Sequence, residues 1–345
     1  MRLFKPNDDP RCHLGPAASR GWKLYRSASF FTHAFVHYQF VSGYRVVAES
    51  VRPCTCLNTS LTKLGKTVMK PLSAPKRAFI TGAGSGIGAD VAKRLDSIGI
   101  ELIISGSNSD KLRALAAELN QQPTIEVADL NDRGQVQRLC VKLKSDYEGL
   151  DIVFINAGVV EIGSFIERDD DAIDREIEIN LRAGLQLIHA CLPGMVQRQQ
   201  GHILATSSVG GVLALKGSSV YSATKFALRG FLSALQQEVI GDGIKVSGIY
   251  PGAIDTNMLR HEATHGGSAL NFLNEPKKVS DVGEAFMKAL KTGKLETYIP
   301  YSDSISARLL GVIPWVVPRL LPLLEKIGER GRDRFIKSRG LKTNR

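Results

Sequence analysis

A tyrosine and a lysine stand four residues apart in the segment Tyr221-Ser-Ala-Thr-Lys225. On a helix this spacing places both side chains on one face. A phenol is ordinarily too weak an acid to exchange protons near neutral pH, but a cation one turn away stabilises the phenolate and lowers its pKa. The pair is therefore a candidate for acid–base chemistry, although such a pair also arises by chance on solvated helix faces.

Two further polar residues precede this pair. Ser208 lies thirteen residues before Tyr221, at the end of an expected strand, where its hydroxyl can hydrogen-bond a substrate oxygen. Asn180 could hold a water that relays protons to Lys225. No metal site is expected, because His261 and His265 lack a second ligand cluster and suit the surface of a lid.

A glycine-rich segment, Thr81-Gly82-Ala83-Gly84-Ser85-Gly86-Ile87-Gly88, follows the first expected strand. Small residues here let the backbone approach a pyrophosphate at the N-terminus of the next helix, where N–H groups and the helix dipole favour anions. The segment predicts a nucleotide site, with a plain tight turn as the alternative. Its position after the first strand of an α/β pattern favours the nucleotide.

The end of the second expected strand bears on the choice of cofactor. An Asp or Glu there would bind the adenosine ribose diol and exclude a 2′-phosphate. The segment Ser105-Gly106-Ser107-Asn108-Ser109 has no acid before Asp110, while Ser107 and Asn108 could donate to a phosphate. NADP is therefore favoured over NAD. The alternative is that these residues only cap the next helix.

Two more segments suit the adenosine half of a nucleotide. Asp129, followed by Leu130, could accept from the adenine amino group, or it could be the N-cap of the following helix. In Asn156-Ala157-Gly158, the small residues leave room for a ribose, and the Asn156 amide can tie neighbouring strands together. A simple turn at the strand end is the alternative.

Short apolar runs alternate with helical stretches from residue 77 onward, as expected for strands joined by crossover helices. The expected strands are 78–81, 101–105, 124–127, 151–155, 201–206, 245–250 and 296–299. The expected helices are 86–98, 109–120, 132–147, 171–199, 218–240 and 279–291. Apolar strands of this kind form a parallel sheet covered on both faces, so we expect a Rossmann-like, doubly wound α/β fold over residues 71–300.

The first 70 residues differ from the rest of the chain in charge and pattern. They carry +8 of the formal net charge of +11 and show no sustained strand or helix periodicity. We interpret residues 1–70 as upstream sequence included by a wrong start choice, with Met69 as the start. A transit-type leader and a disordered basic arm are the alternatives. No basic folded face or known module indicates nucleic-acid binding.

Residues 301–345 form a C-terminal tail that is first apolar and then basic. Its apolar part, Leu309–Leu324, includes three prolines and one arginine. The plain interpretation is a lid or packing segment. The alternative is peripheral membrane contact through residues 309–345, because apolar residues next to cations suit a lipid interface.

Taken together, these motifs resemble the short-chain dehydrogenase/reductase family. The resemblance spans roughly residues 75–300 and rests on TGAGSGIG at 81–88, NAG at 156–158, Asn180, SS at 207–208, YSATK at 221–225 and PGAIDT at 251–256. It implies that Tyr221 is the general acid and base, that Lys225 lowers its pKa and binds the nicotinamide ribose, and that Ser208 orients the substrate oxygen. It also implies a proton relay through Asn180 and nicotinamide contacts from Pro251, Gly252, Ile254 and Thr256. The cofactor supplies the hydride.

The implied function is an NAD(P)-dependent oxidoreductase that interconverts an alcohol and a carbonyl. NADP-binding members of the family often have a basic residue where Ser85 or Ser107 stands, which leaves the cofactor choice open. An epimerase or dehydratase of the same fold would need a larger substrate domain than the chain has after its last strand. A non-catalytic nucleotide-binding protein would not need the full set of Tyr221, Lys225, Ser208 and Asn180.

The substrate end of the expected site is rich in apolar residues. They lie in and around a lid expected over 261–276 and after the serine strand: Met258, Leu259, Leu270, Phe272, Leu273, Val212, Leu213 and Leu215. We therefore expect a small hydrophobic substrate, such as a lipid-, retinoid- or steroid-like alcohol or ketone.

The helix expected over 218–240 has more apolar residues than it needs to pack one face against the sheet. This excess indicates a homo-oligomer, with ordinary packing inside the chain as the alternative. The residues concerned are Phe226, Leu228, Phe231, Leu232 and Leu235. No run of about 18 apolar residues occurs, so no ordinary membrane-spanning helix is indicated. We expect a cytoplasmic protein, with membrane association as the alternative.

Overall fold

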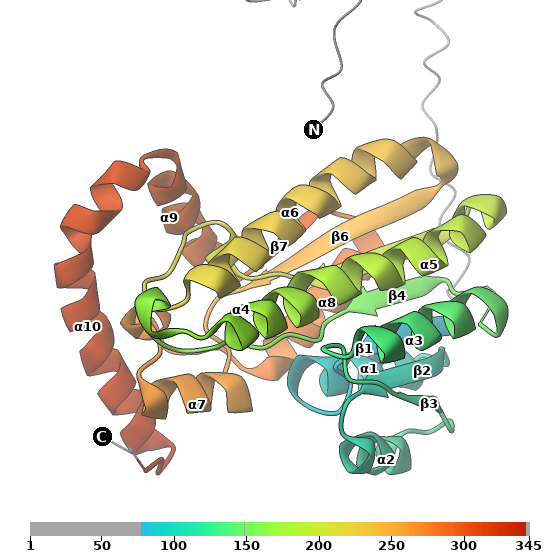
Figure 1. Cartoon of the computed structure of the whole chain (residues 1–345), viewed down its shortest axis with the longest axis horizontal. Helices are drawn as coiled ribbons and strands as arrows, with labels where there is room; N and C mark the ends of the chain where they lie inside the picture. Colours follow the sequence, from blue (N-terminus) through green and yellow to red (C-terminus); the bar gives the residue numbers. More distant parts are fainter. Residues whose placement is uncertain (1–76, 148, 343–345) are drawn as a thin grey trace, which may run out of the picture. The chain divides into compact units, whose positions relative to one another are not determined.

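The computed structural model describes residues 77–147 and 149–342, so residues 1–70 lie outside it. The described chain forms a seven-stranded sheet in the order β3-β2-β1-β4-β5-β6-β7, with every neighbouring pair parallel (Figure 1). The strands are β1 Arg77–Thr81, β2 Glu101–Gly106, β3 Thr124–Val127, β4 Ile152–Ile155, β5 Gly201–Thr206, β6 Ile244–Pro251 and β7 Glu296–Ile299. This arrangement confirms the predicted Rossmann-like, doubly wound α/β fold and all seven strands.

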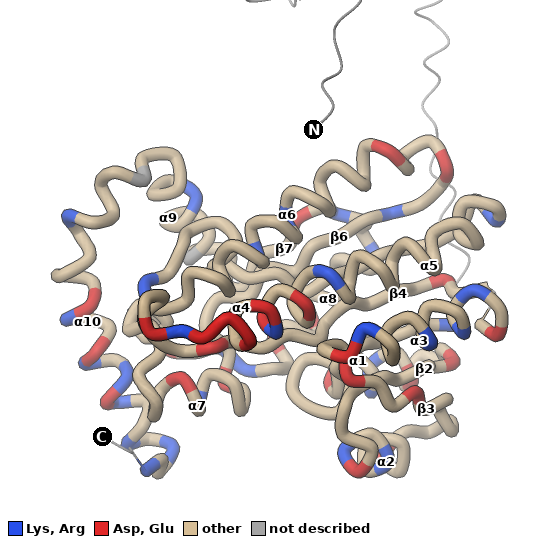
Figure 2. The backbone as a smooth tube through the Cα atoms, viewed as in Figure 1, with Lys and Arg blue, Asp and Glu red and all other residues tan. Residues whose placement is uncertain are grey.

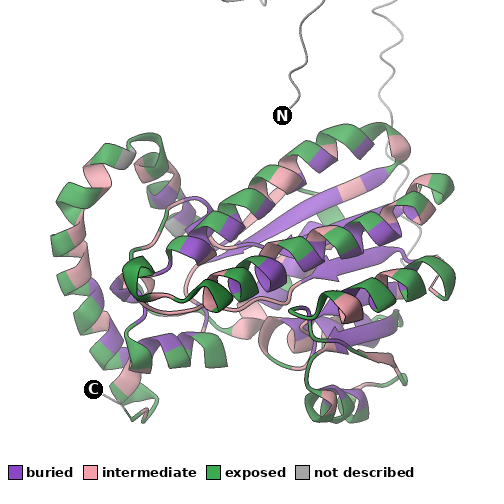
Figure 3. Cartoon of the chain, viewed as in Figure 1, coloured by how far each residue is buried: buried purple, intermediate pink, exposed green. Residues whose placement is uncertain are grey.

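Helices cover both faces of the sheet, and the side chains of each strand alternate between two cores. On β1, for example, Phe79 joins the core under α3, α5 and α6, whereas Ala78 and Ile80 join the core under α1, α2 and α8. The five inner strands are accordingly buried along most of their length, and each helix is buried on the side facing the sheet (Figure 3). The helices are α1 Gly86–Ser97, α2 Ser109–Glu118, α3 Arg133–Ser145, α5 Ala183–Arg198, α6 Ser219–Val239 and α8 Val279–Thr292.

The single helix expected over 171–199 is divided in the structure. It consists of α4 Asp170–Ile177, a π-helical segment Glu178–Arg182, and α5. A π segment widens the helix locally and breaks the regular 3.6-residue repeat, a feature that often marks functional sites. Asn180 lies in the middle of this segment. Sequence periodicity did not reveal this interruption because apolar residues continue through it.

Three helices were not predicted from the sequence. They are α7 Asn257–His265, within the expected lid region, and α9 Tyr301–Val312 and α10 Val317–Ser338 in the tail. Proline explains the failure in the tail, since Pro318 falls at the permitted start of α10 while Pro322 falls inside it. None of the helices in the described ranges is long and apolar enough to cross a membrane.

Candidate active site

A cavity of about 440 Å³ opens at the carboxyl ends of the strands, where the sheet order reverses between β1 and β4. In doubly wound sheets, ligands bind at this switch point. The wall of the cavity includes the glycine-rich turn after β1, the turns after β2, β4 and β5, the start of α6, and α7. Residues separated by as many as 190 positions in the sequence (Thr81 to Asn271) thus face one space.

The glycine-rich turn is shaped by close backbone packing. Gly82 has a φ of +63°, a conformation that favours glycine, and an added Cβ there would stand 2.8 Å from Ala157 Cα. Gly88 does not line the cavity; an added Cβ there would stand 2.3 Å from the Gly82 carbonyl oxygen. Gly88 therefore lets α1 pack tightly against the turn, and Gly86 begins α1 on the cavity wall.

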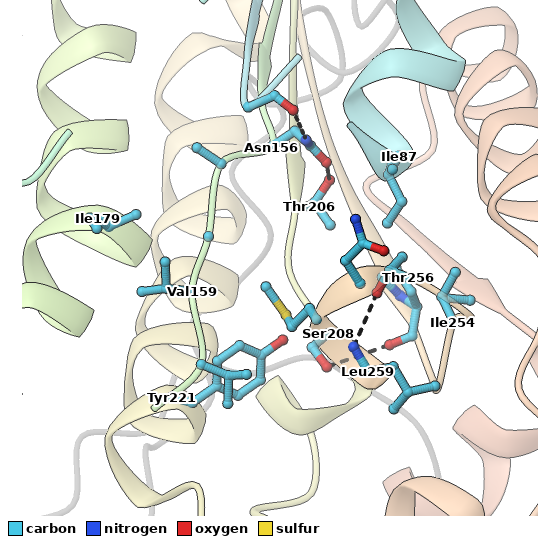
Figure 4. A pocket seen from close by; sticks show the side chains of 18 of the residues that line it. Ile87, Asn156, Val159, Ile179, Thr206, Ser208, Tyr221, Ile254, Thr256 and Leu259 are labelled. Atoms are coloured by element: carbon cyan, nitrogen blue, oxygen red, sulfur yellow. Dashed lines mark hydrogen bonds between the residues drawn. The ribbon is translucent and has the colours of Figure 1, made fainter. Parts of the chain in front are cut away.

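The Asn156 amide ties three strand ends together, as the sequence predicted. Its Nδ2 donates to the carbonyl oxygens of Thr81 and Gly82, at 3.3 Å each, and its Oδ1 accepts from Thr206 Oγ1 at 3.0 Å. Figure 4 shows Asn156 and Thr206 joined in this way above the cavity. The contact fixes β1, β4 and β5 relative to one another at the centre of the site.

The turns after β2 and β3 resolve two alternatives left by the sequence. Asn108 caps α2, because its Oδ1 accepts from Lys111 N at 2.9 Å, whereas Ser107 lines the cavity. Asp132, not Asp129, is the N-cap of α3. Asp129 also lines the cavity, and its Oδ1 accepts from Asn131 N at 2.9 Å. The N-cap interpretation of Asp129 was therefore wrong.

Tyr221 and Ser208 face each other across the substrate end of the cavity (Figure 4). Ser208 is held from behind: its Oγ accepts from Gly210 N at 2.9 Å and donates to the Pro251 carbonyl oxygen at 3.5 Å. The second contact is long, so the serine hydroxyl can turn toward a ligand. A substrate oxygen between the two hydroxyls would receive a hydrogen bond from each.

Lys225 lies one helical turn beyond Tyr221 and is buried. Its Nζ is 5.5 Å from the centroid of the Tyr221 ring and donates to the Thr206 carbonyl oxygen at 3.0 Å. Burial lowers the pKa of Lys225 to about 8, while Glu176 acts in the opposite direction. Lys225 is thus a cation at neutral pH in a place where it can reach a ligand, since its side chain lines the cavity.

The pKa of Tyr221 is not lowered in this structure, contrary to the expectation from its spacing with Lys225. Burial raises the pKa to about 12, the Ser208 hydroxyl lowers it, and the carboxylates of Glu262 and Glu176 raise it. Desolvation of the phenolate outweighs the hydrogen bond from Ser208. The phenol consequently keeps its proton at neutral pH, which suits a proton donor.

Asn180 does not line the cavity, yet its surroundings connect it with Lys225. Its Oδ1 accepts from Val159 N at 2.7 Å and its Nδ2 donates to the Val159 carbonyl oxygen at 2.9 Å. A Cβ added to Gly158 would stand 3.2 Å from Asn180 Oδ1 and 3.5 Å from Lys225 Nζ. The π segment therefore holds the chain after β4 close to the lysine, and the water relay through Asn180 stays a prediction.

Comparisons with known proteins agree with this geometry. The short chain dehydrogenase family model matches residues 76–266. The chain belongs to the short-chain dehydrogenase family. An uncharacterized oxidoreductase of Staphylococcus aureus (strain MRSA252) is 34% identical over 220 residues, which cover 64% of this chain and 92% of that protein.

Two solved structures share the fold of this short-chain dehydrogenase. One is a short-chain dehydrogenase from Sphingobium yanoikuyae in complex with NADPH, with a TM-score of 0.61 and 28% identity over 69% of this chain and 95% of the other. The second is the bulky-bulky ketone specific alcohol dehydrogenase from Comamonas testosteroni, with a TM-score of 0.59 and 27% identity. The aligned region covers 71% of this chain and 95% of the Comamonas chain.

Most of the residues predicted for the site of this short-chain dehydrogenase meet at the cavity. All lie on its wall except Gly88, which packs behind it, and Asn180, which acts on the loop after β4. The residues on the wall are Gly82, Ser85, Gly86, Ile87, Ser107, Asp129, Leu130, Asn156, Ala157, Gly158, Ser208, Tyr221, Lys225, Pro251, Gly252, Ile254 and Thr256.

The substrate end of the short-chain dehydrogenase is less apolar than the sequence indicated. Of the expected apolar residues, Met258, Leu259 and Leu215 line the cavity. Phe272 instead packs on Phe335 of α10, at 5.5 Å between ring centroids. Val212 does not line the cavity either, because it is buried against Tyr250 and Tyr298.

Sequence reasoning missed several polar residues on this wall, among them Glu262 and Asn271. A signal was present, because Glu262 follows Met258 and Leu259 by four and three positions on α7 and therefore shares their face. It was overlooked because α7 itself was not predicted. Asn271 lies in the 3₁₀ turn Ala269–Phe272, which has no such periodicity.

Proposed function

We propose that this short-chain dehydrogenase is an NADP-dependent oxidoreductase that interconverts an alcohol and a carbonyl on a largely apolar substrate. The observation that carries the proposal is the meeting of Tyr221, Ser208 and Lys225 on one wall of a cavity that the glycine-rich turn forms at its other end. The Comamonas relative supports a carbonyl substrate, since it is a bulky-bulky ketone specific alcohol dehydrogenase.

In the reductive direction, Tyr221 donates the proton. A phenol with a pKa of about 12 is protonated at neutral pH, and it is still a stronger acid than the alcohol that forms. Ser208 hydrogen-bonds the same oxygen and stabilises its developing negative charge. In the oxidative direction, the phenolate must form first, and the high pKa of Tyr221 makes that direction slower near neutral pH.

Lys225 is assigned a binding and electrostatic role. Its ammonium group lies beside Tyr221 and is anchored to the Thr206 carbonyl oxygen, which leaves other donors for a ribose hydroxyl. The cation also stabilises the phenolate whenever Tyr221 has given up its proton. Asn180 supports this arrangement by fixing the chain at Val159, next to Gly158.

The residues present fit a nicotinamide dinucleotide. Gly82 and Gly86 have no side chain that would keep a pyrophosphate away from the N-terminus of α1, where the backbone favours an anion. Ser105 Oγ is buried, lines the same cavity and has no hydrogen-bond partner among the described residues, so it is available to a ligand. When bound, the nicotinamide would supply or accept the hydride.

NADP is proposed over NAD because of the end of β2. No carboxylate follows this strand before Asp110, and Ser107 lines the cavity. A cation missed by the sequence reasoning is also near: an added Cβ on Gly84 would stand 3.1 Å from Lys111 Cβ. Lys111 is therefore a candidate for the basic residue that a 2′-phosphate needs. The NADPH complex of the Sphingobium relative supports the same preference.

Equilibrium binding of NADPH and NADH, followed by nicotinamide fluorescence, tests the cofactor assignment. Ketones of increasing size then test turnover through the loss of NADPH absorbance. Tight NADPH binding with reduction of apolar ketones is the expected result. If neither nucleotide binds, the proposed function is wrong. NADPH binding that is followed by no turnover of any ketone would favour a non-catalytic nucleotide-binding protein.

We further propose that α9 and α10 contact an anionic lipid surface. Apolar side chains at their junction are exposed, with 75% exposure at Val312 and 64% at Trp315. Residues 301–345 carry ten Lys and Arg against four acids, and Figure 2 shows cations interspersed with fewer acids along α10. An apolar tip with flanking cations suits the boundary between headgroups and acyl chains.

The position of α9 and α10 supports delivery of an apolar substrate from such a surface. Glu325 of α10 forms a salt bridge of 2.9 Å with Lys216, next to the cavity residue Leu215. α10 also packs on the turn Ala269–Phe272, which includes the cavity residue Asn271. α10 thus contacts both segments that border the substrate end.

A homo-oligomer also stays a prediction. Most of the apolar residues on which it rested pack inside the chain, since Leu228, Leu232 and Leu235 are buried in the core under α6. Phe231 packs partly against the same core, whereas Phe226 is 42% exposed. Ordinary packing therefore accounts for most of this side of α6.

A further inference from the structure

A buried carboxylate lies on the substrate end of the cavity. Glu262 lines the cavity together with Met258 and Leu259, yet only 7% of its surface is exposed. Asn271 Nδ2 donates to its Oε2 at 2.9 Å. Asn271 lines the cavity as well, so an acidic oxygen and an amide stand side by side next to the apolar residues Met258 and Leu259.

No Lys or Arg in the described part of the chain forms a salt bridge with this carboxylate. Arg332 of α10 donates to the Gly267 carbonyl oxygen at 3.2 Å and forms its salt bridge with Glu329, at 3.9 Å. Burial raises the pKa of Glu262 to about 7. Burying a carboxyl without a cation is unfavourable unless hydrogen bonds satisfy it, and Asn271 satisfies only Oε2. Oε1 is therefore free to accept from a ligand.

Helix α10 packs against the segment that carries Asn271, the partner of Glu262. An added Cβ on Gly328 would stand 2.1 Å from the Ala269 carbonyl oxygen, and one on Gly331 would stand 1.9 Å from the Phe272 carbonyl oxygen. The backbone of α10 thus closes on both sides of Asn271. Gly267 N also donates to the Glu262 carbonyl oxygen at 2.8 Å. A preorganised pair of this kind can bind a ligand group without a large loss of side-chain entropy.

We infer that Glu262 and Asn271 form a subsite for a hydroxyl group of the substrate, separate from the oxygen that reacts between Tyr221 and Ser208. A hydroxyl can donate to the carboxylate and can accept from the acid form, so its binding tolerates either protonation state. An ammonium group is disfavoured because Lys225 already places a cation on the same cavity wall. The inference rests on the proposed function and narrows its substrate class to hydroxylated apolar ketones and the corresponding diols.

The test compares matched ketones, with and without a hydroxyl at increasing distances from the carbonyl, in the full-length protein with NADPH. At the best distance, the hydroxyl should raise kcat/KM by about tenfold to a hundredfold, mainly through a lower KM. Glu262→Met should bring the ratio of kcat/KM for the hydroxylated ketone to kcat/KM for the unsubstituted ketone close to one. Glu262→Gln keeps the side-chain volume and an acceptor for Asn271, and it should reduce the ratio by about threefold or more.

His261→Gln is the matched control, because His261 is the preceding residue of α7 and is exposed. It should leave the ratio of hydroxylated to unsubstituted ketone at the wild-type value. A ratio near one for wild type at every hydroxyl position, or an equal ratio in wild type and both Glu262 variants, would overturn the subsite. A stronger preference for an amine at the same position would overturn its assignment to a hydroxyl. Failure of every ketone to react would instead contradict the oxidoreductase itself.

Discussion

Asn180 and Val159 are joined by two hydrogen bonds, one to each polar group of the Val159 backbone. The pairing is made possible by the π segment Glu178–Arg182, which places the Asn180 amide opposite the chain leaving β4. An irregular helix thus fixes an irregular loop. Because Gly158 lies between Asn180 and Lys225, the same pairing sets the surroundings of the lysine.

Replacing Asn180 should therefore affect both stability and rate. Asn180→Ala leaves a backbone donor and acceptor without partners and should lower the free energy of unfolding by about 2 kcal/mol. It should also lower kcat by about tenfold or more, because Gly158 and Lys225 lose their fixed geometry. Urea unfolding and steady-state kinetics measure the two effects. Asn131→Ala, at an exposed asparagine, is the control, and an unchanged kcat in Asn180→Ala would show that the pairing is only structural.

Tyr221→Phe should abolish turnover while NADPH binding changes little. The variant removes the hydroxyl that donates the proton, and losses of general acid catalysis amount to about a hundredfold or more. Nicotinamide fluorescence reports binding, and the loss of NADPH absorbance reports turnover. Tyr301→Phe, at a tyrosine with 62% exposure, should behave as wild type. Retained activity in Tyr221→Phe would rule out this tyrosine as the proton donor.

Most of the fold could be predicted because parallel strands are buried on both faces and stand out as apolar runs. All seven strands were predicted, including β3, whose residues are only partly buried. The tail escaped prediction because proline ordinarily interrupts helices, and Pro322 nevertheless lies inside α10. The π segment escaped for a different reason, since its hydrogen bonding leaves no mark on apolar periodicity.

The nucleotide end of the site was more predictable than the substrate end. Glycine spacing and strand ends reveal a nucleotide site because the backbone itself forms it, as at Gly82 and Gly86. The residues that line the substrate end depend on which side of the expected lid faces the cavity. The packing of α10 against this segment decides which side does so. Phe272 turns toward Phe335 and leaves Asn271 and Glu262 at the cavity, which the amino-acid types alone could not indicate.

The end of β2 should control the choice of nucleotide. A Cβ at Gly106 would meet only Leu112, at 3.6 Å or more, so Gly106→Asp can be accommodated and would supply a ribose-binding carboxylate. It should shift the ratio of NADH to NADPH affinity by about tenfold or more toward NADH. Fluorescence titration measures both affinities. An unchanged ratio would show that this strand end does not set the preference.

Lys111→Ala tests the same assignment from the side of the phosphate. It should weaken NADPH binding by about fivefold and leave NADH binding unchanged, because NADH has no 2′-phosphate. Lys291→Ala removes an exposed cation from α8 and should affect neither nucleotide. Equal weakening of both nucleotides by Lys111→Ala would assign Lys111 to general electrostatics and not to the phosphate.

Lipid binding should depend on the junction of α9 and α10. The double variant Val312→Ser/Trp315→Ser should lower partitioning onto phosphatidylcholine vesicles containing phosphatidylserine by about tenfold or more, because two apolar side chains lose their burial. Vesicle sedimentation with full-length protein measures it. Ile240→Ser, at another exposed apolar residue, is the control. If the double variant changes the oligomeric state and leaves partitioning unchanged, a second copy of the chain covers this face.

The burial of Glu262 should make stability depend on pH. Its pKa is raised from 4.5 to about 7, chiefly by desolvation, while Asn271 lowers it and Glu176 raises it further. The folded state therefore holds this proton more tightly than the unfolded state, and stability falls as pH rises from about 4.5 to about 7.

Glu262→Gln removes this dependence. Relative to wild type, its free energy of unfolding should increase by up to about 3 kcal/mol between the two ends of that pH range and stay constant above it. Urea unfolding at a series of pH values measures the difference. Glu284→Gln, at an exposed glutamate of α8, should show no such change. A difference between Glu262→Gln and wild type that is independent of pH would mean that the Glu262 carboxyl titrates as it does in water, and the subsite would then lose its buried acceptor.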